Sequence, residues 1–524
     1  MDECEVLETI LNQRGIEDID EFLNPPEDAL LPFDSLKNIE KAYEILQRHI
    51  NNQSSIAVLW DTDLDGVSSG TIMTRYLWKI TDKGKVFSFI NQGKKHGLIG
   101  GDITRFTGMG LLIIVDSLDK DISQYKAVRD AGTEIIILDH HAIDPSIPYE
   151  DYATLVSSQD EYDNPQLSGA GVVWKFCKYI DEEELTDYAD SLIDLAACGL
   201  VADVMDMTVM ENRYIVNEGL KQIHNPAIKK IVGSFEFNST AISFSIAPLI
   251  NASCRMFENE SAMKLFLADD NKEVLAYKKA LTKCKEAQNA EVDKLMPGVL
   301  NQCEAQQNRK MIIVKINSKY GIGGLLGNKL VEKYQRPILV LKDSGDRYSG
   351  SMRAVGVEDF REICNESGFA EANGHELASG IDILKKDFEN FVDHIETVLS
   401  CIETSEREIP VDIQLSVSDI SRSLVDKIKM IDRVSGEGFK PVRVYVGDIA
   451  DYEVGNMSDH KHLVIKPTGW LWVIKWNYTG TFEEYEDAGI MGDIVSCVGT
   501  LDSGFLGRTF VLKLVCDEIW IGGE

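Results

Sequence analysis

Two spacings of hydrophobic residues alternate along the first part of the chain. Short apolar runs, which are typical of buried strands, are separated by stretches in which apolar residues recur at helical spacing. The runs lie at 56–60, 86–90, 111–115 and 135–138. Strands that alternate with helices predict a doubly wound parallel sheet.

The pattern changes twice further along the chain. A helical pattern at 274–295 leads to a second α/β unit, which begins at 311–314 and returns at 337–341. After Pro410, short strands separated by turns are typical of a small barrel: 442–446, 462–466, 471–476 and 510–515. We therefore predict the α/β class, with two α/β domains joined by a long helix and a β-barrel at the C-terminal end.

Side chains that bind metals follow these segments at the ends where ligands bind in open α/β sheets. Four segments end this way, and their polar residues are, in chain order, Asp61, Asp63 and Asp65, then Asp116, then Asp139, His140 and His141, and finally Asp203. A single aspartate after a strand is often only a helix N-cap. Four such ends in one sheet indicate a site for two divalent cations, a pair that commonly drives phosphoryl displacement.

Two other ligands fit this sequence less well. The aspartates at 61–65 also resemble the start of an EF-hand calcium loop, which needs helices on both sides and a glutamate at its twelfth position. Here a strand precedes the loop, and the twelfth residue is Ile72. A dinucleotide-binding turn at 321–327 would need a glycine in place of Leu326. Both alternatives are therefore disfavoured.

Composition limits the partners and the compartment. A formal net charge of −33 argues against a broad nucleic-acid-binding surface, although an acidic protein can hold phosphates through bound cations and a few local Lys or Arg residues. The ten cysteines have no C-x-x-C spacing, which indicates free thiols in a reducing compartment. No apolar run approaches the ~18 residues of a membrane span, and the first residues lack a basic signal region. We expect a cytoplasmic protein with no membrane partner.

The order of these motifs resembles a known family. Asp-x-Asp-x-Asp-Gly, a strand-terminal Asp, Asp-His-His and Gly-x-x-Ala-Asp are the four motifs of the DHH phosphoesterases, and the chain is most similar to the RecJ-like single-stranded-DNA exonucleases. Further similar stretches lie at 22–25, 211–213, 218–220, 250–252 and 255–256. The resemblance implies five units: an N-terminal helical segment (1–50), a DHH catalytic domain (51–215), a helical region with the connecting helix (216–300), a DHH-associated substrate-binding domain (301–405) and an OB-like nucleic-acid-binding domain (406–524).

The resemblance also implies roles for the residues at the strand ends. The implied ligands of two Mn²⁺ or Mg²⁺ ions are Asp63, Asp65, Asp116, His140 and Asp203. Asp61 and His141 would complete or support this cluster. Asp139 would orient a histidine through its second ring nitrogen.

Residues outside the first domain are expected to bind the substrate. The segments 350–353 and 373–380, which we interpret as turn-rich, resemble the Gly-Ser-x-Arg and Gly-Gly-His motifs of the DHH-associated domain. By that resemblance, Ser351 and Arg353 hold a terminal 5′-phosphate, and His375 contacts the phosphate under attack. Further candidate strand contacts are Asn251 and Arg255, with Lys94 and Lys95 as weaker ones.

These expectations combine into one predicted activity. The chain would be a Mn²⁺- or Mg²⁺-dependent exonuclease that degrades single-stranded DNA from its 5′ end in repair, recombination or replication, with a single-strand-binding protein or a helicase as a partner. One alternative is a DHH phosphodiesterase acting on short oligonucleotides or cyclic dinucleotides, for which the C-terminal barrel would be superfluous. Another is a non-catalytic scaffold like the inactive DHH-family subunit of the eukaryotic replicative helicase, against which the four intact motifs argue.

Overall fold

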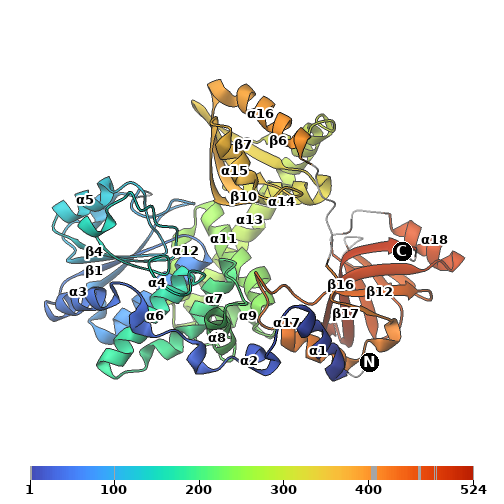
Figure 1. Ribbon diagram of the computed structural model, residues 1–524, viewed down its shortest axis with the longest axis horizontal. Coiled ribbons are helices and arrows are strands. Elements are labelled where there is room, and N and C mark those ends of the chain that lie inside the picture. The colour runs from blue at the N-terminus through green and yellow to red at the C-terminus, as the bar shows by residue number, and fades with distance from the viewer. Residues whose placement is uncertain are drawn as a thin grey trace.

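The computed structural model describes residues 3–99, 101–402, 410–457, 462–476, 478 and 481–522. Figure 1 shows three parts that each contain a sheet, with helices α7, α9, α11 and α13 between them. Every cysteine whose side chain is described is free, as predicted. No helix in the described part of the chain is both long and apolar enough to cross a bilayer.

The first sheet is parallel, as predicted, and has five strands in the order β2-β1-β3-β4-β5. Its strands are β1 (Ile56–Trp60), β2 (Val86–Ile90), β3 (Leu111–Val115), β4 (Glu134–Asp139) and β5 (Thr154–Ser157). Alternate residues of β1 pack on opposite faces: Val58 and Trp60 join the larger core, whereas Ala57 and Leu59 join a smaller one. The sheet therefore carries apolar layers on both faces, which leaves its strand ends as the place for polar side chains.

Helices cover both faces of this sheet. The larger core contains residues of α3 (Ile39–Asn51), α4 (Leu64–Ile80), α6 (Gly169–Glu184) and α7 (Ile193–Ala202). The smaller core contains Tyr125 and Val128 of α5 (Ser123–Asp130). The next segment is helical, and its elements are α8 (Met210–Gly219), α9 (Pro226–Val232), α10 (Ser239–Ala241), the π-helix η7 (Ile242–Ile246), α11 (Ala247–Met256) and α12 (Asn259–Leu267).

The connecting helix α13 (Asn271–Glu304) is longer than the 274–295 pattern that predicted it. It leads to a second five-stranded sheet, ordered β6-β7-β8-β10-β9. The strands are β6 (Ile312–Lys315), β7 (Ile338–Ser344), β8 (Arg347–Arg353), β9 (Ala370–His375) and β10 (Ala378–Leu384), with helices α14 (Gly323–Tyr334), α15 (Phe360–Glu366) and α16 (Phe388–Cys401). The interpretation of 350–353 as turn-rich was wrong, because this segment pairs within the sheet as part of β8. In 373–380 only residues 376–377 form a turn, which joins the paired strands β9 and β10.

The third part contains a seven-stranded mixed sheet ordered β11-β12-β16-β17-β15-β14-β13. Its elements are β11 (Ile413–Leu415), α17 (Arg422–Asp432), β12 (Val444–Ile449), β13 (Glu453–Met457), β14 (His462–Lys466), β15 (Leu471–Lys475), α18 (Phe482–Met491), β16 (Val495–Leu506) and β17 (Thr509–Ile521). No pairing between the end strands β11 and β13 is seen among the described residues. The OB-like barrel therefore stays a prediction.

The proposed domain limits also stay predictions. The 50/51 limit lies within α3, the 215/216 limit within α8 and the 300/301 limit within α13. The 405/406 limit lies outside the described residues.

The N-terminal segment, α1 (Glu3–Gln13) and α2 (Ile19–Leu23), joins the first and third parts. Arg213 of α8 is buried against the rings of Phe22 and Phe439, with its guanidinium carbon 3.5 and 5.0 Å from their centroids. It donates hydrogen bonds to the backbone carbonyls of Phe22, Met207 and Val434. One cation thus ties together three segments that are far apart in the sequence.

Candidate metal centre

The loop between β1 and α4 positions the first carboxylates. Asp61 follows the buried strand, and Asp63 is the N-cap of α4, where its Oδ1 accepts the Gly66 amide at 3.1 Å. A Cβ at Gly66 would lie 2.5 Å from the Asp61 carbonyl carbon, so this close approach requires glycine. The tight turn holds Asp61 and Asp63 at the carboxyl end of the sheet.

The neighbouring strands add Asp116 and His140. Asp116 follows β3 with a left-handed backbone (φ 56°), and its amide donates to the Leu138 carbonyl of β4 at 2.9 Å. Such a backbone is uncommon for a residue other than glycine, and it turns the chain sharply at the strand end. A Cβ at Gly169 would lie 2.4 Å from Asp116 Oδ1, so the start of α6 closes over this carboxylate.

The imidazole of His140 lies where these carboxylates meet. Its Nε2 is 3.2 Å from Asp116 Oδ1, 3.4 Å from Asp203 Oδ2 and 3.8 Å from Asp65 Oδ2. Three sets of side chains each have all their ligand atoms within 4.8 Å of one another: Asp61 with Asp63 and Asp116, Asp65 with His140 and Asp203, and Asp116 with His140 and His141. All the side chains predicted as metal ligands therefore gather in one cluster.

The charges of this cluster fit a divalent cation. Burial, with the neighbouring carboxylates, raises the pKa of Asp63 to about 6, that of Asp203 to about 8 and that of Asp116 well above its ordinary value. Burial lowers the pKa of His140, which favours the neutral imidazole that a metal ion can bind. Asp116 Oδ1 and His140 Nε2 are buried without a hydrogen-bond partner in the described part of the chain. A bound cation would satisfy both atoms and offset the carboxylate charge.

Asp65 has a second set of partners. Its two carboxylate oxygens accept the backbone amides of Gly169 at 2.8 Å and Ala170 at 2.9 Å, at the start of α6. These bonds are favourable at a helix N-terminus, where unpaired amides face a negative charge. Asp65 thus fixes α6 against the metal cluster, a contact that the spacing of the motif did not reveal.

Two histidines on the edge of the cluster are held by aspartates. Asp139 is fully buried, and its Oδ1 lies 2.9 Å from Nδ1 of His141, as expected for a carboxylate that orients a histidine. Asp139 raises the pKa of His141 to about 10. The His96 Nδ1 lies 2.7 Å from Asp61 Oδ1, which the sequence analysis missed although His96 follows the Lys94-Lys95 pair.

A cationic cluster, which we define as Lys94, Arg255 and Arg353, lies beside the metal residues. Burial and mutual repulsion lower the pKa values of Lys94 and Arg353, and Lys94 also interacts with Asp63. A Cβ on Gly321 would be 3.6 Å from both Arg255 Cα and Lys94 Cε, so three parts of the sequence meet here. None of the three cations has an ion pair within the described ranges. The cluster therefore suits an anion from outside the chain.

The remaining candidate residues are Ser351, Asn251 and His375. Ser351 shares β8 with Arg353, and its Oγ would be 3.3 Å from a Cβ on Gly323. Asn251 shares α11 with Arg255, and its Oδ1 is buried without a partner in the described part of the chain. His375 is exposed at the end of β9, and no contact recorded for the described residues joins its side chain to the metal cluster.

The chain is similar to known proteins over most of its length. Residues 55–200 match the model of the DHH family, N-terminal domain. The putative SPbeta prophage-derived single-strand DNA-specific exonuclease YorK of Bacillus subtilis is 32% identical over 421 residues, covering 73% of this chain and 72% of that protein. The chain belongs to the RecJ-like exonucleases of the DHH family. The RecJ exonuclease of B. subtilis is 25% identical over 430 residues, which are 76% of this chain and 53% of that protein.

Solved structures of this DHH family share the fold. RecJ from Thermus thermophilus in complex with Mn²⁺ has a TM-score of 0.78 at 21% identity, covering 98% of this chain and 76% of that chain. A second structure, exonuclease RecJ bound to manganese, has a TM-score of 0.59 at 23% identity and covers 71% of this chain and 97% of that one. The first match extends over all three sheet-containing parts, so the RecJ-like architecture includes the C-terminal sheet.

Proposed function

We propose that this RecJ-like chain is a Mn²⁺- or Mg²⁺-dependent exonuclease that hydrolyses single-stranded DNA from the 5′ end to 5′-mononucleotides. The observation that carries the proposal is the buried carboxylate and imidazole cluster with a cationic cluster beside it. The relatives YorK and RecJ are named as single-strand DNA-specific exonucleases, which supports the substrate class. RecJ structures with Mn²⁺ and with Mg²⁺ support the choice of ions.

The chain offers ligands for two ions. Asp61, Asp63 and Asp116 form one set, and Asp65, His140 and Asp203 form the other. Two bound cations would lower the pKa of a water molecule and offset the charge that develops on the phosphate. The α6 amides that bind Asp65 keep its carboxylate in place while substrate and product exchange.

His141 acts on the phosphate in this proposal. The buried Asp139 holds Nδ1 of His141, and the side chain is 56% exposed, so its Nε2 can reach a substrate. With a pKa of about 10 the imidazole is protonated at neutral pH and donates a hydrogen bond from Nε2 to a phosphate oxygen. His375 of the second sheet is assigned to the same phosphate.

The cationic cluster gives the enzyme its preference for an end. Arg353 and Arg255, with Ser351, hold the terminal 5′-phosphate, because guanidinium groups bind phosphate oxygens through paired hydrogen bonds. Arg353 is already oriented by Asn328, whose Oδ1 accepts a hydrogen bond from Nε of Arg353 at 2.6 Å. A strand whose end is fixed there passes its first phosphodiester over the adjacent metal residues. Asn251 supplies a further contact with the DNA strand. The proposed setting is DNA repair, recombination or replication, with a single-strand-binding protein or a helicase as partner.

One digestion experiment tests this function. Oligonucleotides labelled at the 5′ or 3′ end, single- and double-stranded, are incubated with Mn²⁺, Mg²⁺ or a chelator. We expect a labelled mononucleotide from the 5′-labelled single strand in Mn²⁺ or Mg²⁺ only. Mononucleotide release from the 3′ label first would overturn the direction, and digestion in chelator would overturn the metal requirement.

Variants connect this activity to the cluster. His140→Ala and Asp203→Asn should each lower the rate of digestion by about 100-fold or more. His394→Ala, in helix α16 beside the second sheet, should leave this rate unchanged. Arg353→Ala should abolish the preference for a 5′-phosphorylated end over a 5′-hydroxyl. Hydrolysis of cyclic dinucleotides but not of long strands would favour the phosphodiesterase alternative. Metal binding without any hydrolysis would favour the scaffold.

A further inference from the structure

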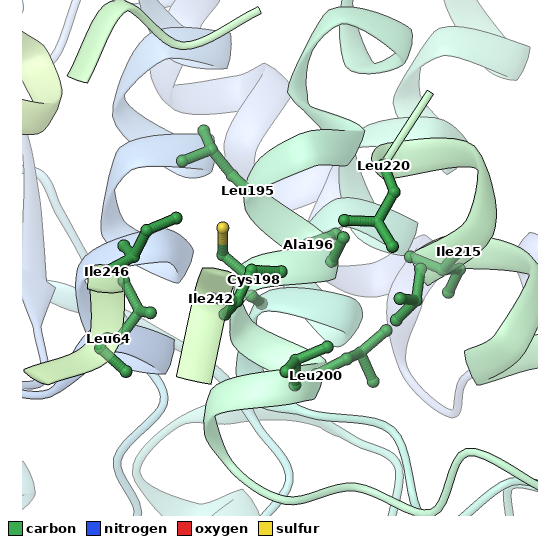
Figure 2. Packing of buried hydrophobic residues seen from close by; sticks show 14 of the residues in the cluster. Leu64, Leu195, Ala196, Cys198, Leu200, Ile215, Leu220, Ile242 and Ile246 are labelled. Atoms are coloured by element: carbon green, nitrogen blue, oxygen red, sulfur yellow. The ribbon is translucent and has the colours of Figure 1, made fainter. Parts of the chain in front are cut away.

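The π-helix η7 (Ile242–Ile246) has one face in the core and one in solvent. Ile242 and Ile246 are fully buried, and Figure 2 shows them in one packed group with Leu64 and Cys198. Leu64 stands between Asp63 and Asp65, and Cys198 belongs to α7, the helix that ends at Asp203. The π-helix is therefore packed directly against the elements that carry the metal cluster.

The opposite face of η7 presents an exposed aromatic ring. Phe244 is 74% exposed and stands between two exposed serines, Ser243 and Ser245. Single exposed apolar residues are common on protein surfaces. Exposure alone is therefore no evidence of a binding site, and the evidence for one is the position of Phe244 along the helix.

Phe244 lies on the same helix face as Arg255 of the cationic cluster. The Ala247 amide donates to the Ile242 carbonyl, so η7 runs into α11 without a break. At spacings of three or four residues, Phe244 is followed by Pro248, Asn251 and Arg255, all of them partly exposed, while the residues between them are mostly buried. At a rise of about 1.5 Å per residue, Phe244 lies about 16 Å along the helix from Arg255.

We propose that Phe244 is a stacking platform for a base of the bound single strand, a few nucleotides from the end held by the cationic cluster. This rests on the proposed function. At about 3.4 Å per nucleotide of one strand, 16 Å corresponds to at most about five nucleotides, and to fewer when the strand is extended. A phenyl ring stacks with any base, so this contact strengthens binding without sequence preference.

The placement also predicts a length dependence. A strand too short to reach from Arg255 to Phe244 gains nothing from the ring, whereas a longer strand does. Because η7 is packed on Leu64, the ring keeps a fixed distance from the metal cluster. The stacked base would then set the register of the strand.

The test compares kcat/KM for a 5′-phosphorylated 12-mer and a 5′-phosphorylated dinucleotide. Phe244→Ala should lower kcat/KM for the 12-mer about 10-fold, as the loss of one stacked base implies, and leave the dinucleotide within twofold. Phe244→Trp should restore the 12-mer rate. Phe235→Ala is the matched control, because Phe235 is 80% exposed but lies in the loop after α9, outside the α11 face.

A 12-mer series with one base removed at a time identifies the partner of the ring. In the wild type, one abasic position should cost the same factor as Phe244→Ala, and it should cost nothing further in that variant. Equal losses for the 12-mer and the dinucleotide would show a packing defect and overturn the proposal. An unchanged 12-mer rate in Phe244→Ala, or an equal loss in Phe235→Ala, would also overturn it. A wild type inactive on all single strands would instead refute the proposed function itself.

Discussion

Replacing Arg213 with Met should loosen the attachment of the third part to the rest of the molecule. The guanidinium donates to the carbonyls of Phe22, Met207 and Val434, and it lies over the rings of Phe22 and Phe439. Met fills similar volume but leaves the three carbonyls without this donor. Each buried acceptor left unsatisfied costs about 1–3 kcal/mol.

Relief of a buried charge offsets part of this loss. Burial lowers the pKa of Arg213 to about 9, so the folded protein bears a desolvation cost that Met removes. We expect a net destabilisation of the attachment of about 3 kcal/mol, which corresponds to a roughly 100-fold larger population of the detached form. Hydrogen exchange of the backbone at 434–442 should accelerate by that factor.

Arg129→Met is the control, because Arg129 is exposed and its one hydrogen bond to another described residue goes to the Tyr152 carbonyl at 3.2 Å. It should leave exchange at 434–442 unchanged. If Arg213→Met behaves like this control, in exchange and in urea unfolding, Arg213 does not hold the segments together.

Further predictions concern the metal cluster. The pKa values of Asp203 and Asp63 are raised to about 8 and about 6, so protons should compete with Mn²⁺ for these carboxylates. Calorimetry should therefore show the Mn²⁺ affinity falling about 100-fold from pH 8.5 to pH 6, and an affinity that does not change with pH would contradict this. The metal-free protein should lose stability as the pH rises from about 4 to about 8, since these raised pKa values favour the protonated folded state, and Mn²⁺ should reverse the loss in thermal melts. Gly169→Ala should weaken Mn²⁺ binding at least about 10-fold by displacing Asp116, whereas Gly298→Ala, with open space around its Cβ, should not; equal affinities would refute the close approach.

The apolar runs predicted the first sheet because its strands are buried on both faces. The strands at 56–60, 86–90 and 111–115 have the expected limits, but β5 (154–157) was missed, since only two of its four residues, Leu155 and Val156, are apolar. In the second sheet, Gly350 and Ser351 have low strand propensity, yet β8 pairs on both sides there. A Cβ at Gly350 would lie 2.1 Å from the Val340 carbonyl oxygen, so the glycine reflects close strand packing rather than a turn.

The candidate ligands at 61–65, 116 and 139–141 were predictable because they follow strands. The expectation that Asp203 ends a segment of the same sheet was wrong, because Asp203 is the C-cap of helix α7. The contacts that hold the ligands were not predictable. His96 meets Asp61 across 35 positions, and the amide of Gly169 meets Asp65 across 104. Such contacts depend on how separate elements pack, which no local pattern of hydrophobic and polar residues encodes. Phe244 likewise became notable only when its exposure and its helix face were known.

The most direct test of the metal centre is anomalous diffraction from crystals soaked in Mn²⁺. We expect two manganese peaks about 3.5–4 Å apart, one bonded to Asp63 and the other to His140. Manganese found only at surface carboxylates, with none within bonding distance of Asp63, Asp116, His140 or Asp203, would contradict the account.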